Sequence, residues 1–453
     1  MKKTRKGTGW RGAGYLFLPV ALLSLLLSSC GGGITTAGGG TGGTGVGPVT
    51  GFGSVKLNGI RYATDNANIV IGGVENRPES ELKVGMRVRI DGVFSTTDNT
   101  GTAGRIEVIR EVRGPVDDNG VDNVLNRIRV AGQTILVAPA TIFDNVTDIL
   151  ALQSLQAGTF RHPEVEVHGA ADDNGFIHAT YIRKGADDFS LTDNAIVRGK
   201  MRNFNSTLRT FTIGNQPVSY PLLGLEKVPP TAVFADDIYL EVKGVLSVVG
   251  GAGTLSAGRI EVLDNAVGGN NDPVRVEGYV VSGTLDSFVL LGPGGKVTVN
   301  GVGATLSGGT VAPGRKVQVE GAVSGATLRA SVVRVRPAGS VQVEAVMLVA
   351  PNVAAGTFTV LTKKIQTDGY TRFKDDVGSD PTFSLAKLNP NDNVKVAGSY
   401  DAAGDVVNAI LVERIASLDN GRPLLQGPVS GEDALLARFT IIGIDVIAGS
   451  TNT

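Results

Sequence analysis

The chain has 453 residues, of which 42% are hydrophobic, 19% are charged and 5% are aromatic, and its formal net charge is −1. This composition is that of a globular protein, and the 63 glycines, far above the usual share of about 7%, indicate many turns. A chain without a basic excess lacks the surface typical of nucleic-acid-binding proteins, so we expect no nucleic acid partner. Its single cysteine excludes an intramolecular disulfide.

Residues 1–29 have the pattern of a signal peptide. Basic residues precede an apolar stretch, Tyr15 to Leu27, that is too short and wrongly flanked for a membrane-spanning helix. The next residues, up to Cys30, complete a Leu-Ser-Ser-Cys sequence that resembles the lipobox of bacterial lipoproteins. The resemblance implies cleavage before Cys30, a lipid on its thiol that contacts the membrane and, because Gly31 follows, sorting to the outer membrane. An ordinary signal peptide with a chance cysteine is the alternative.

Residues 30–48 are expected to be a flexible tether. Ten of the eighteen residues from Gly31 to Pro48 are glycine, and such a segment cannot bury enough apolar surface to fold. Removal of the leader also removes five basic residues and the only tryptophan, Trp10, so the mature net charge becomes −6. No indole then remains to stack on sugars or bases.

One short pattern recurs five times in the rest of the chain: apolar, polar, apolar, any residue, glycine. We call a segment with this pattern a marker strand and its last residue a marker glycine. An alanine-led strand follows each marker strand, and a glycine-containing strand then opens the next copy. Two further strands and a short segment of weak helical character precede the next marker strand. The marker glycines are Gly92, Gly169, Gly244, Gly321 and Gly398, spaced by 75 to 77 residues.

The order of these segments predicts the fold. Apolar and polar residues alternate, so each strand buries one face. Three strands, a short helical link and two strands match a small five-stranded OB-like barrel, so we expect an all-β chain of tandem barrels on a flexible N-terminal tether. An immunoglobulin-like sandwich would need about seven strands and about 100 residues per copy. The predicted copies are 49–112, 113–190, 191–268, 269–337 and 338–418.

An incomplete sixth copy is predicted in residues 419–453. Segments 425–429 and 438–442 repeat the first two strands, and 445–447 begins the third, but no marker strand follows. These strands either cap the fifth copy or belong to a fragment of a longer protein, and we favour the fragment. An unfinished barrel would expose edge amides and an apolar face that contains Phe439.

The first copy carries the clearest family resemblance. Its Gly-Phe-Gly-Ser-Val opening at 51–55, Asn58-Gly59, and the Gly-Met-Arg-Val-Arg-Ile-Asp-Gly sequence at 85–92 resemble the domain of unknown function five-six-six-six. The resemblance extends over about 49–418 and implies tandem repeats in a bacterial envelope lipoprotein. Ala345 departs from the glycine of the other copies. The family has no established activity, so the resemblance implies no catalytic residue.

All three histidines, His162, His168 and His178, lie in the second copy. The last two flank a predicted hairpin turned by Asp172 to Gly175, and could bind a metal together with His162 or Asp172. Comparison of the copies favours ordinary exposed strand positions, because the corresponding residues elsewhere are of varied type. We therefore expect neither a metal nor a cofactor.

Other acidic segments have simpler interpretations. Residues 117–120, Asp-Asp-Asn-Gly, are expected to form a hairpin turn, because no spaced acidic loop of the calcium-binding type continues from them. The pair Asp375-Asp376 is expected in a solvated loop. The sequence also lacks a Gly-x-Ser-x-Gly nucleophile motif.

We therefore expect a non-enzymatic cell-envelope lipoprotein whose barrels act as a spacer, structural or binding module. The alternative is a small-ligand or glycan-binding protein that uses a barrel face. A spacer predicts loops that differ among copies with no copy distinguished, whereas a binder predicts polar and aromatic side chains converging in one copy.

Overall fold

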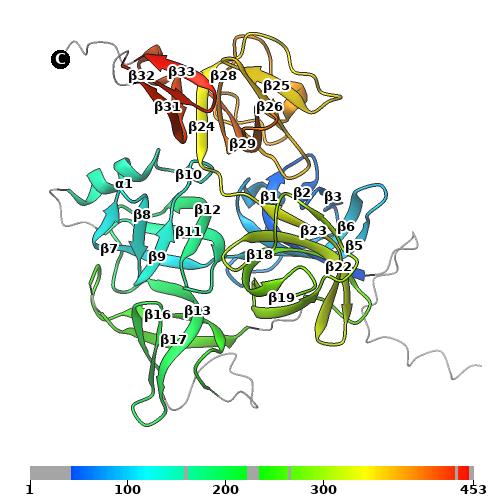
Figure 1. Ribbon diagram of the computed structural model, residues 1–453. Coiled ribbons are helices and arrows are strands. Elements are labelled where there is room, and N and C mark those ends of the chain that lie inside the picture. The colour runs from blue at the N-terminus through cyan, green and yellow to red at the C-terminus, as the bar shows by residue number, and fades with distance from the viewer. Residues whose placement is uncertain are drawn as a thin grey trace, which may run out of the picture. The chain divides into compact units, whose positions relative to one another are not determined.

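The computed structural model contains almost only strands (Figure 1). The prediction of an all-β chain of tandem OB-like barrels is confirmed. Among the described residues, none of the helices has the length and hydrophobicity of a membrane-spanning helix. The described residues are 42–157, 162–221, 234–251, 253–263, 267–433 and 437–447.

The first copy is a closed five-stranded barrel. Strand β1 pairs antiparallel with β2 and β5, β2 pairs antiparallel with β3, and β6 closes the ring parallel to β3 and antiparallel to β5. This is the order of an OB-like barrel. The link between β3 and β5 adds the short strand β4 (Asn68–Val70), parallel to β6, and the 3-10 helix η1 (Glu79–Glu81). The ring strands are β1 (Gly42–Gly51), β2 (Val55–Leu57), β3 (Ile60–Ala63), β5 (Arg87–Ser95) and β6 (Thr100–Ile109).

The next three copies close by the same set of pairings. The second has β7 (Val112–Asp122), β8 (Arg127–Val130), β9 (Gln133–Leu136), β11 (Glu164–Ala171) and β12 (Ile177–Lys184), with β10 (Ile142–Asp144) and helix α1 (Ile149–Gln156) in its link. The third has β13 (Asn194–Asn205), β14 (Thr210–Ile213), β15 (Gln216–Ser219), β16 (Tyr239–Leu246) and β17 (Leu255–Val262). The fourth has β18 (Pro273–Thr284), β19 (Ser287–Gly292), β20 (Gly295–Asn300), β22 (Lys316–Ser324) and β23 (Thr327–Arg336), with β21 (Thr305–Ser307) in its link.

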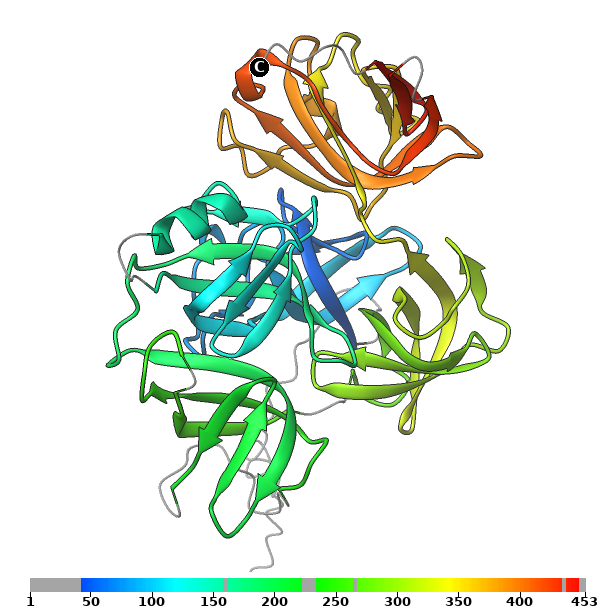
Figure 2. The ribbon, with the colours of Figure 1, turned by 60° about the vertical axis from the view of Figure 1, so that its left-hand side comes forward.

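The fifth copy has the same strand order, but its described strands β24 and β25 share no ladder. Its long strands β28 and β29 curve around the core (Figure 2). After the 3-10 helix η3 (Asp419–Gly421), strand β30 (Leu424–Gln426) pairs with β24, and β31 (Val429–Asp433), β32 (Arg438–Ile441) and β33 (Ile444–Ile447) form a separate sheet. The strands of the fifth copy are β24 (Val341–Val346), β25 (Thr357–Val360), β26 (Lys363–Gln366), β28 (Asn393–Asp401) and β29 (Val406–Ile415), with β27 (Arg372–Asp375) and the 3-10 helix η2 (Leu385–Lys387) in the link.

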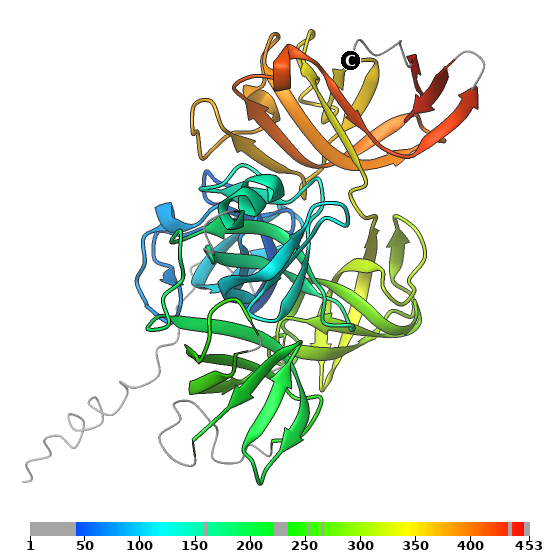
Figure 3. The same cartoon turned by 90° about the vertical axis from the view of Figure 1, so that its left-hand side faces the viewer.

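Helix α1 forms where the second copy was expected to have weak helical character. The carboxylate of Asp148 caps it by accepting a hydrogen bond from the amide of Ala151 at 2.8 Å. Leu152 is fully buried in the core of the second copy, which the helix covers at one end (Figure 3). The helix is therefore held by one capping residue and one apolar contact face.

The copies are joined through their opening strands. Strand β1 of the first copy pairs parallel with β18 of the fourth, so that Thr44 lies beside Val274. Strand β7 of the second copy pairs antiparallel with β13 of the third, with Val112 beside Val197. Consequently two barrels share each of the two large sheets, and the first copy has a ladder with a copy more than 200 residues away in sequence.

Every marker glycine lies at a β-bulge opposite the alanine of the alanine-led strand. In the third copy Gly244 pairs with Ala257, and Gly258 is the extra residue of the bulge. The backbones approach so closely that a Cβ atom at Gly244 would lie 2.0 Å from the carbonyl oxygen of Ser256. The marker glycine is thus required by this close approach within a strand, and not by a strand end or a positive φ angle.

The prediction of a flexible coil up to Pro48 is wrong for residues 42–48, which belong to β1. Their glycines accommodate neighbouring side chains: a Cβ atom at Gly43 would lie 2.6 Å from the ring of Phe94, and one at Gly47 would lie 2.6 Å from Oδ1 of Asn58. The predicted hairpin turn at 117–120 is also wrong, because these residues form an irregular part of β7.

Candidate functional site

The three histidines of the second copy do not gather around one point. The ladder of β11 and β12 places His168 beside Tyr181 and His178 beside Ala170. Among the described residues, no group of three or more His, Cys, Asp or Glu side chains is placed to hold a metal ion. The predicted lipidation residue, Cys30, lies outside the described residues.

His168 is fully buried, in contrast to the exposed position expected for it. Its Nδ1 lies 2.8 Å from the carbonyl oxygen of Ile109, its Nε2 lies 3.0 Å from Oε1 of Glu166, and Tyr181 packs edge-on against its ring. Burial alone would raise the pKa of Glu166, but the contact with His168 and the nearby arginine charges hold that pKa well below its usual range. His168 therefore joins the first two copies through Ile109.

The other two histidines are partly exposed. Nδ1 of His162 lies 3.1 Å from the carbonyl oxygen of Val116. Nε2 of His178 lies 3.1 Å from Oδ2 of Asp172, and its ring stacks on Tyr279 of the fourth copy with the ring centres 4.3 Å apart. Each histidine thus has its own backbone or carboxylate partner.

Arg87 connects three copies through buried contacts. Its Nη1 donates to Oε1 of Glu111 at 3.0 Å and to the carbonyl oxygen of Gly169 at 2.8 Å, both in or next to the second copy. Its Nη2 donates to the carbonyl oxygen of Glu277 in the fourth copy at 3.1 Å. The side chains of Arg87 and Glu111 are only 4% and 6% exposed, so the packing of these copies encloses the ion pair, and separating them would break the hydrogen bonds of Arg87 to the two carbonyl oxygens.

Arg372 connects the fifth copy to the second. Its Nη1 donates to the carbonyl oxygen of Thr180 at 2.8 Å and its Nη2 donates to that of Ala140 at 2.6 Å. The hydroxyl of Thr180 in turn donates to the carbonyl oxygen of Gly85 in the first copy at 2.7 Å. Burial lowers the pKa of Arg372 to about 10, so its guanidinium stays charged at neutral pH.

A groove of about 1610 Å³ is formed where the links of the first, second and fifth copies meet. Nine acidic but only three basic residues line it, together with aromatic residues from all three copies. Its acidic residues are Glu79, Asp144, Asp148, Glu344, Asp375, Asp376, Asp380, Glu413 and Asp419, and its aromatic residues are Phe52, Phe143, Tyr181 and Phe373.

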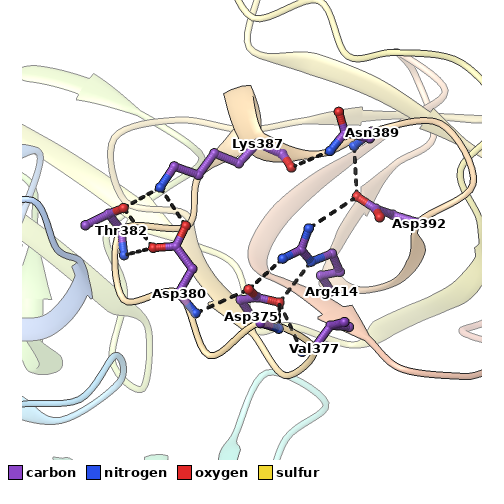
Figure 4. A network of polar contacts seen from close by, with 9 residues as sticks. Asp375, Val377, Asp380, Thr382, Lys387, Asn389, Asp392 and Arg414 are labelled. Atoms are coloured by element: carbon purple, nitrogen blue, oxygen red, sulfur yellow. Dashed lines mark hydrogen bonds and ion pairs between the residues drawn. The ribbon is translucent and has the colours of Figure 1, made fainter.

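Asp375 organises the fifth-copy side of this groove (Figure 4). Its carboxylate accepts hydrogen bonds from Nε and Nη2 of Arg414 at 2.9 and 2.6 Å, and from the amides of Val377, Gly378 and Asp380 at 3.0 to 3.2 Å. The hydrogen bonds from Arg414 hold the pKa of Asp375 well below its usual range. The expected solvation of Asp375 is therefore wrong: the side chain is fully buried and fixes the loop.

The neighbouring carboxylates of the groove are also paired. Glu413 lies 2.9 Å from Nζ of Lys395 and 3.1 Å from that of Lys374. Burial would raise the pKa of Glu413, but these two ammonium groups lower it overall. The hydroxyl of Tyr181 donates to Asp144. The groove therefore has a wall of paired carboxylates beside the partly exposed rings of Phe143 and Phe373. This arrangement offers hydrogen-bond acceptors and stacking surface to a polar molecule.

Sequence reasoning missed the contacts between copies because they join distant segments. A partial signal existed in the links: Thr141 and Thr371 occupy corresponding places, and each donates to the carbonyl oxygen of the bulge alanine of its own copy, Ala179 or Ala409, at 2.9 Å. An alignment of the copies would have identified these threonines as structural residues. It would not have identified the residues that Arg87 and Arg372 contact in other copies.

Comparison with known proteins finds a family model that matches three segments of the chain. Residues 46–107, 113–183 and 349–412 match the family described as Domain of unknown function (DUF5666). The comparison with curated proteins gave no match. A solved structure titled drosophila Unr CSD456 is 12% identical and aligns over 47% of this chain and 89% of its own, with a TM-score of 0.13, which is too low to relate the two arrangements.

Proposed function

We propose that this chain, which carries tandem DUF5666 domains, is a non-enzymatic cell-envelope lipoprotein whose barrels form a packed structural scaffold. The observation that carries the scaffold proposal is the set of buried polar contacts centred on Arg87, which tie the first, second and fourth copies together. Independent spacer units would not need a buried ion pair at their junction. The scaffold has no nucleic acid partner, in keeping with its acidic mature charge.

The envelope location rests on the lipobox-like sequence that ends in Cys30. Acyl chains on this residue would anchor the protein, since each buried CH₂ contributes about 0.8 kcal/mol to membrane binding. Gly31 after the cysteine favours the outer membrane. The protein would then contact the membrane only through its N-terminal lipid.

Metabolic labelling with an alkyne fatty acid tests the anchor. We expect label on the wild type in the outer-membrane fraction and none on Cys30→Ser. Equal labelling of both proteins, or recovery of the labelled wild type only with the inner membrane, would contradict this part of the proposal.

A second candidate function is the binding of a small ligand or glycan, favoured by the groove between the links. Its aromatic residues and paired carboxylates would offer stacking and hydrogen-bond acceptors to a polar molecule. A screen of the mature chain against cell-wall fragments and a glycan array tests this. Binding that is lost in Phe143→Ser and kept in the exposed-surface variant Val124→Ser would support it, whereas the same binding in all three proteins would exclude the groove.

A further inference from the structure

A second cavity lies where the first, second, fourth and fifth copies meet. It has a volume of about 110 Å³ and shares no lining residue with the groove of the candidate site. Most of its lining residues are polar, and the charged ones are Lys316, Arg336, Arg372, Glu277 and Asp368. Three cations thus face two carboxylates, which leaves one positive charge in excess.

Among the described residues, Arg372 is bound only by backbone groups. It is 3% exposed, and its guanidinium donates to two carbonyl oxygens of the second copy. In the described part of the chain, the carboxylates that act on its charge are those of Glu277 and Glu413, and both are paired with lysines instead. A buried charge without a close counter-charge is costly, so an anion in the cavity would stabilise this guanidinium.

The barrel itself does not require a charge at this position. Arg372 pairs with the residue that lies two places after the bulge alanine of the fifth copy. The residues in the same register of the first, second and fourth copies are Asn68, Ile142 and Thr305. Because these barrels close with a neutral residue there, the buried arginine serves the junction between copies and not the fold of its own copy.

Arg336 forms the more exposed side of the cavity. Its Nη1 donates to Oδ2 of Asp368 at 3.1 Å, and its guanidinium lies over the ring of Tyr370, 4.7 Å from the ring centre. The side chains of Arg336 and Asp368 are 23% and 46% exposed, so water screens this pair more than it screens Arg372. Asp368 therefore does little to balance the buried charge.

Gln318 has hydrogen-bonding capacity to spare on the same wall of the fourth copy. It lies two residues after Lys316, so both side chains point to the same side of β22. Gln318 is buried, and among the described residues neither the nitrogen nor the oxygen of its side chain has a hydrogen-bond partner. Since buried amides are normally satisfied, this orphaned group indicates that polar molecules enter this side of the junction.

We propose that the cavity binds inorganic phosphate, held by Lys316, Arg336 and Arg372. Charge-assisted hydrogen bonds from ammonium and guanidinium groups are the usual way in which proteins hold phosphate. The cavity is too small for a nucleotide or a glycan, because pockets for such molecules usually measure about 300–1,000 Å³. A bound phosphate would supply the negative charge that Arg372 needs and would tie the fourth copy to the fifth.

Glu277 selects phosphate over sulfate. Burial would raise the pKa of Glu277, but Lys316 and the neighbouring arginines lower it overall, so its carboxylate is ionised and can only accept hydrogen bonds. Phosphate keeps a proton at neutral pH and can donate a hydrogen bond to this carboxylate. Sulfate has no proton to donate, so Glu277 would repel it.

Equilibrium dialysis of the full chain with radiolabelled phosphate, at pH 7.5 and constant ionic strength, tests this site. We expect saturable binding to a single site that weakens more than about tenfold in Arg336→Gln. The matched control is Arg329→Gln, which removes the same charge from an exposed position of the same strand and should leave binding unchanged. Unlabelled sulfate should displace the label at least about tenfold less well than phosphate, and Glu277→Gln should narrow that difference because an amide can donate to sulfate.

Three results of the dialysis would overturn the proposal: no saturable binding, equal affinity of wild type and Arg336→Gln, or equal displacement by sulfate and phosphate. Arsenate locates the site without any substitution, since it keeps a proton as phosphate does and scatters X-rays anomalously. In crystals of the wild type soaked with arsenate, we expect an anomalous peak between Lys316 and Arg372. A peak only at other places, or no peak, would also overturn the proposal.

Discussion

Gly244 and Ala257 pair across a β-bulge, and the carbonyl oxygen of Ser256 occupies the space that a side chain at Gly244 would need. The same glycine–alanine pair recurs in all five complete copies. The glycine that recurs in the sequence is therefore needed because the backbones of the marker strand and the alanine-led strand come into contact at this bulge in every barrel.

We predict that Gly244→Ala destabilises the protein by about 1–3 kcal/mol, because the new methyl group must displace backbone rather than a flexible side chain. Gly258→Ala is the matched control in the same bulge, since a Cβ atom there would lie 3.8 Å from its nearest neighbour, the carbonyl oxygen of Lys243. Thermal unfolding should show a lower Tm only for Gly244→Ala. Equal Tm values for both variants would contradict the close-approach argument.

We predict that Arg372→Ala loosens the fifth copy from the second. The change leaves the buried carbonyl groups of Thr180 and Ala140 without their donors, at a cost of about 2–4 kcal/mol. Limited proteolysis should then release the fifth copy faster than in wild type. The control is Lys364→Ala, at an exposed position of β26; a similar release from both variants would show that Arg372 does not act as a clamp.

We predict that Asp117→Asn stabilises the protein at pH 7.5. Burial raises the pKa of Asp117 from 3.8 to about 6, although the amide of Gly132 donates to its carboxylate. The folded chain therefore binds this proton more tightly than the unfolded chain, and stability falls as the pH rises from about 4 to about 6. An asparagine avoids that loss, which amounts to at most about 3 kcal/mol.

Thermal unfolding at several pH values tests this sign. The Tm of Asp117→Asn should exceed that of wild type at pH 7.5, and the difference should disappear at pH 4 and below. Asp286→Asn, at an exposed turn residue, serves as the control for a general charge effect. A Tm difference that grows as the pH falls would mean that the carboxylate stabilises the fold.

Local patterns in the sequence predicted the barrels well. Three patterns depend only on contacts between neighbouring strands of one copy: the alternation of apolar and polar residues, the spacing of the marker glycines and the alanine that follows each marker glycine. Because these patterns recur in five copies, each copy supports the same interpretation. Helix α1 was also predicted, because Asp148 and the apolar residues after it are a local signal.

Contacts between distant segments could not be predicted in this way. In the sequence, Gly43 and Gly47 have the pattern of a flexible linker. In the structure, Phe94 fills the space beside Gly43 and Asn58 fills the space beside Gly47. Likewise, Asp375 belongs to a pair of acidic residues typical of solvated loops, and only the fold brings Arg414 to it from 39 residues away. The groove and the contacts between copies are formed by residues of several copies. The sequence of a single copy therefore contains no pattern that predicts them.

The pairing of the first copy with the fourth is the central claim of the scaffold account, and a cysteine cross-link tests it most directly. A Cβ atom at Gly42 would lie 3.9 Å from Oδ1 of Asp272, so in a Cys30→Ser background the double variant Gly42→Cys/Asp272→Cys should form an intramolecular disulfide on mild oxidation. The control Gly42→Cys/Ser206→Cys pairs the same strand with an exposed turn of the third copy. A mobility shift on non-reducing gels for the first variant alone is the predicted result, and no shift, or the same shift in both, would contradict the account.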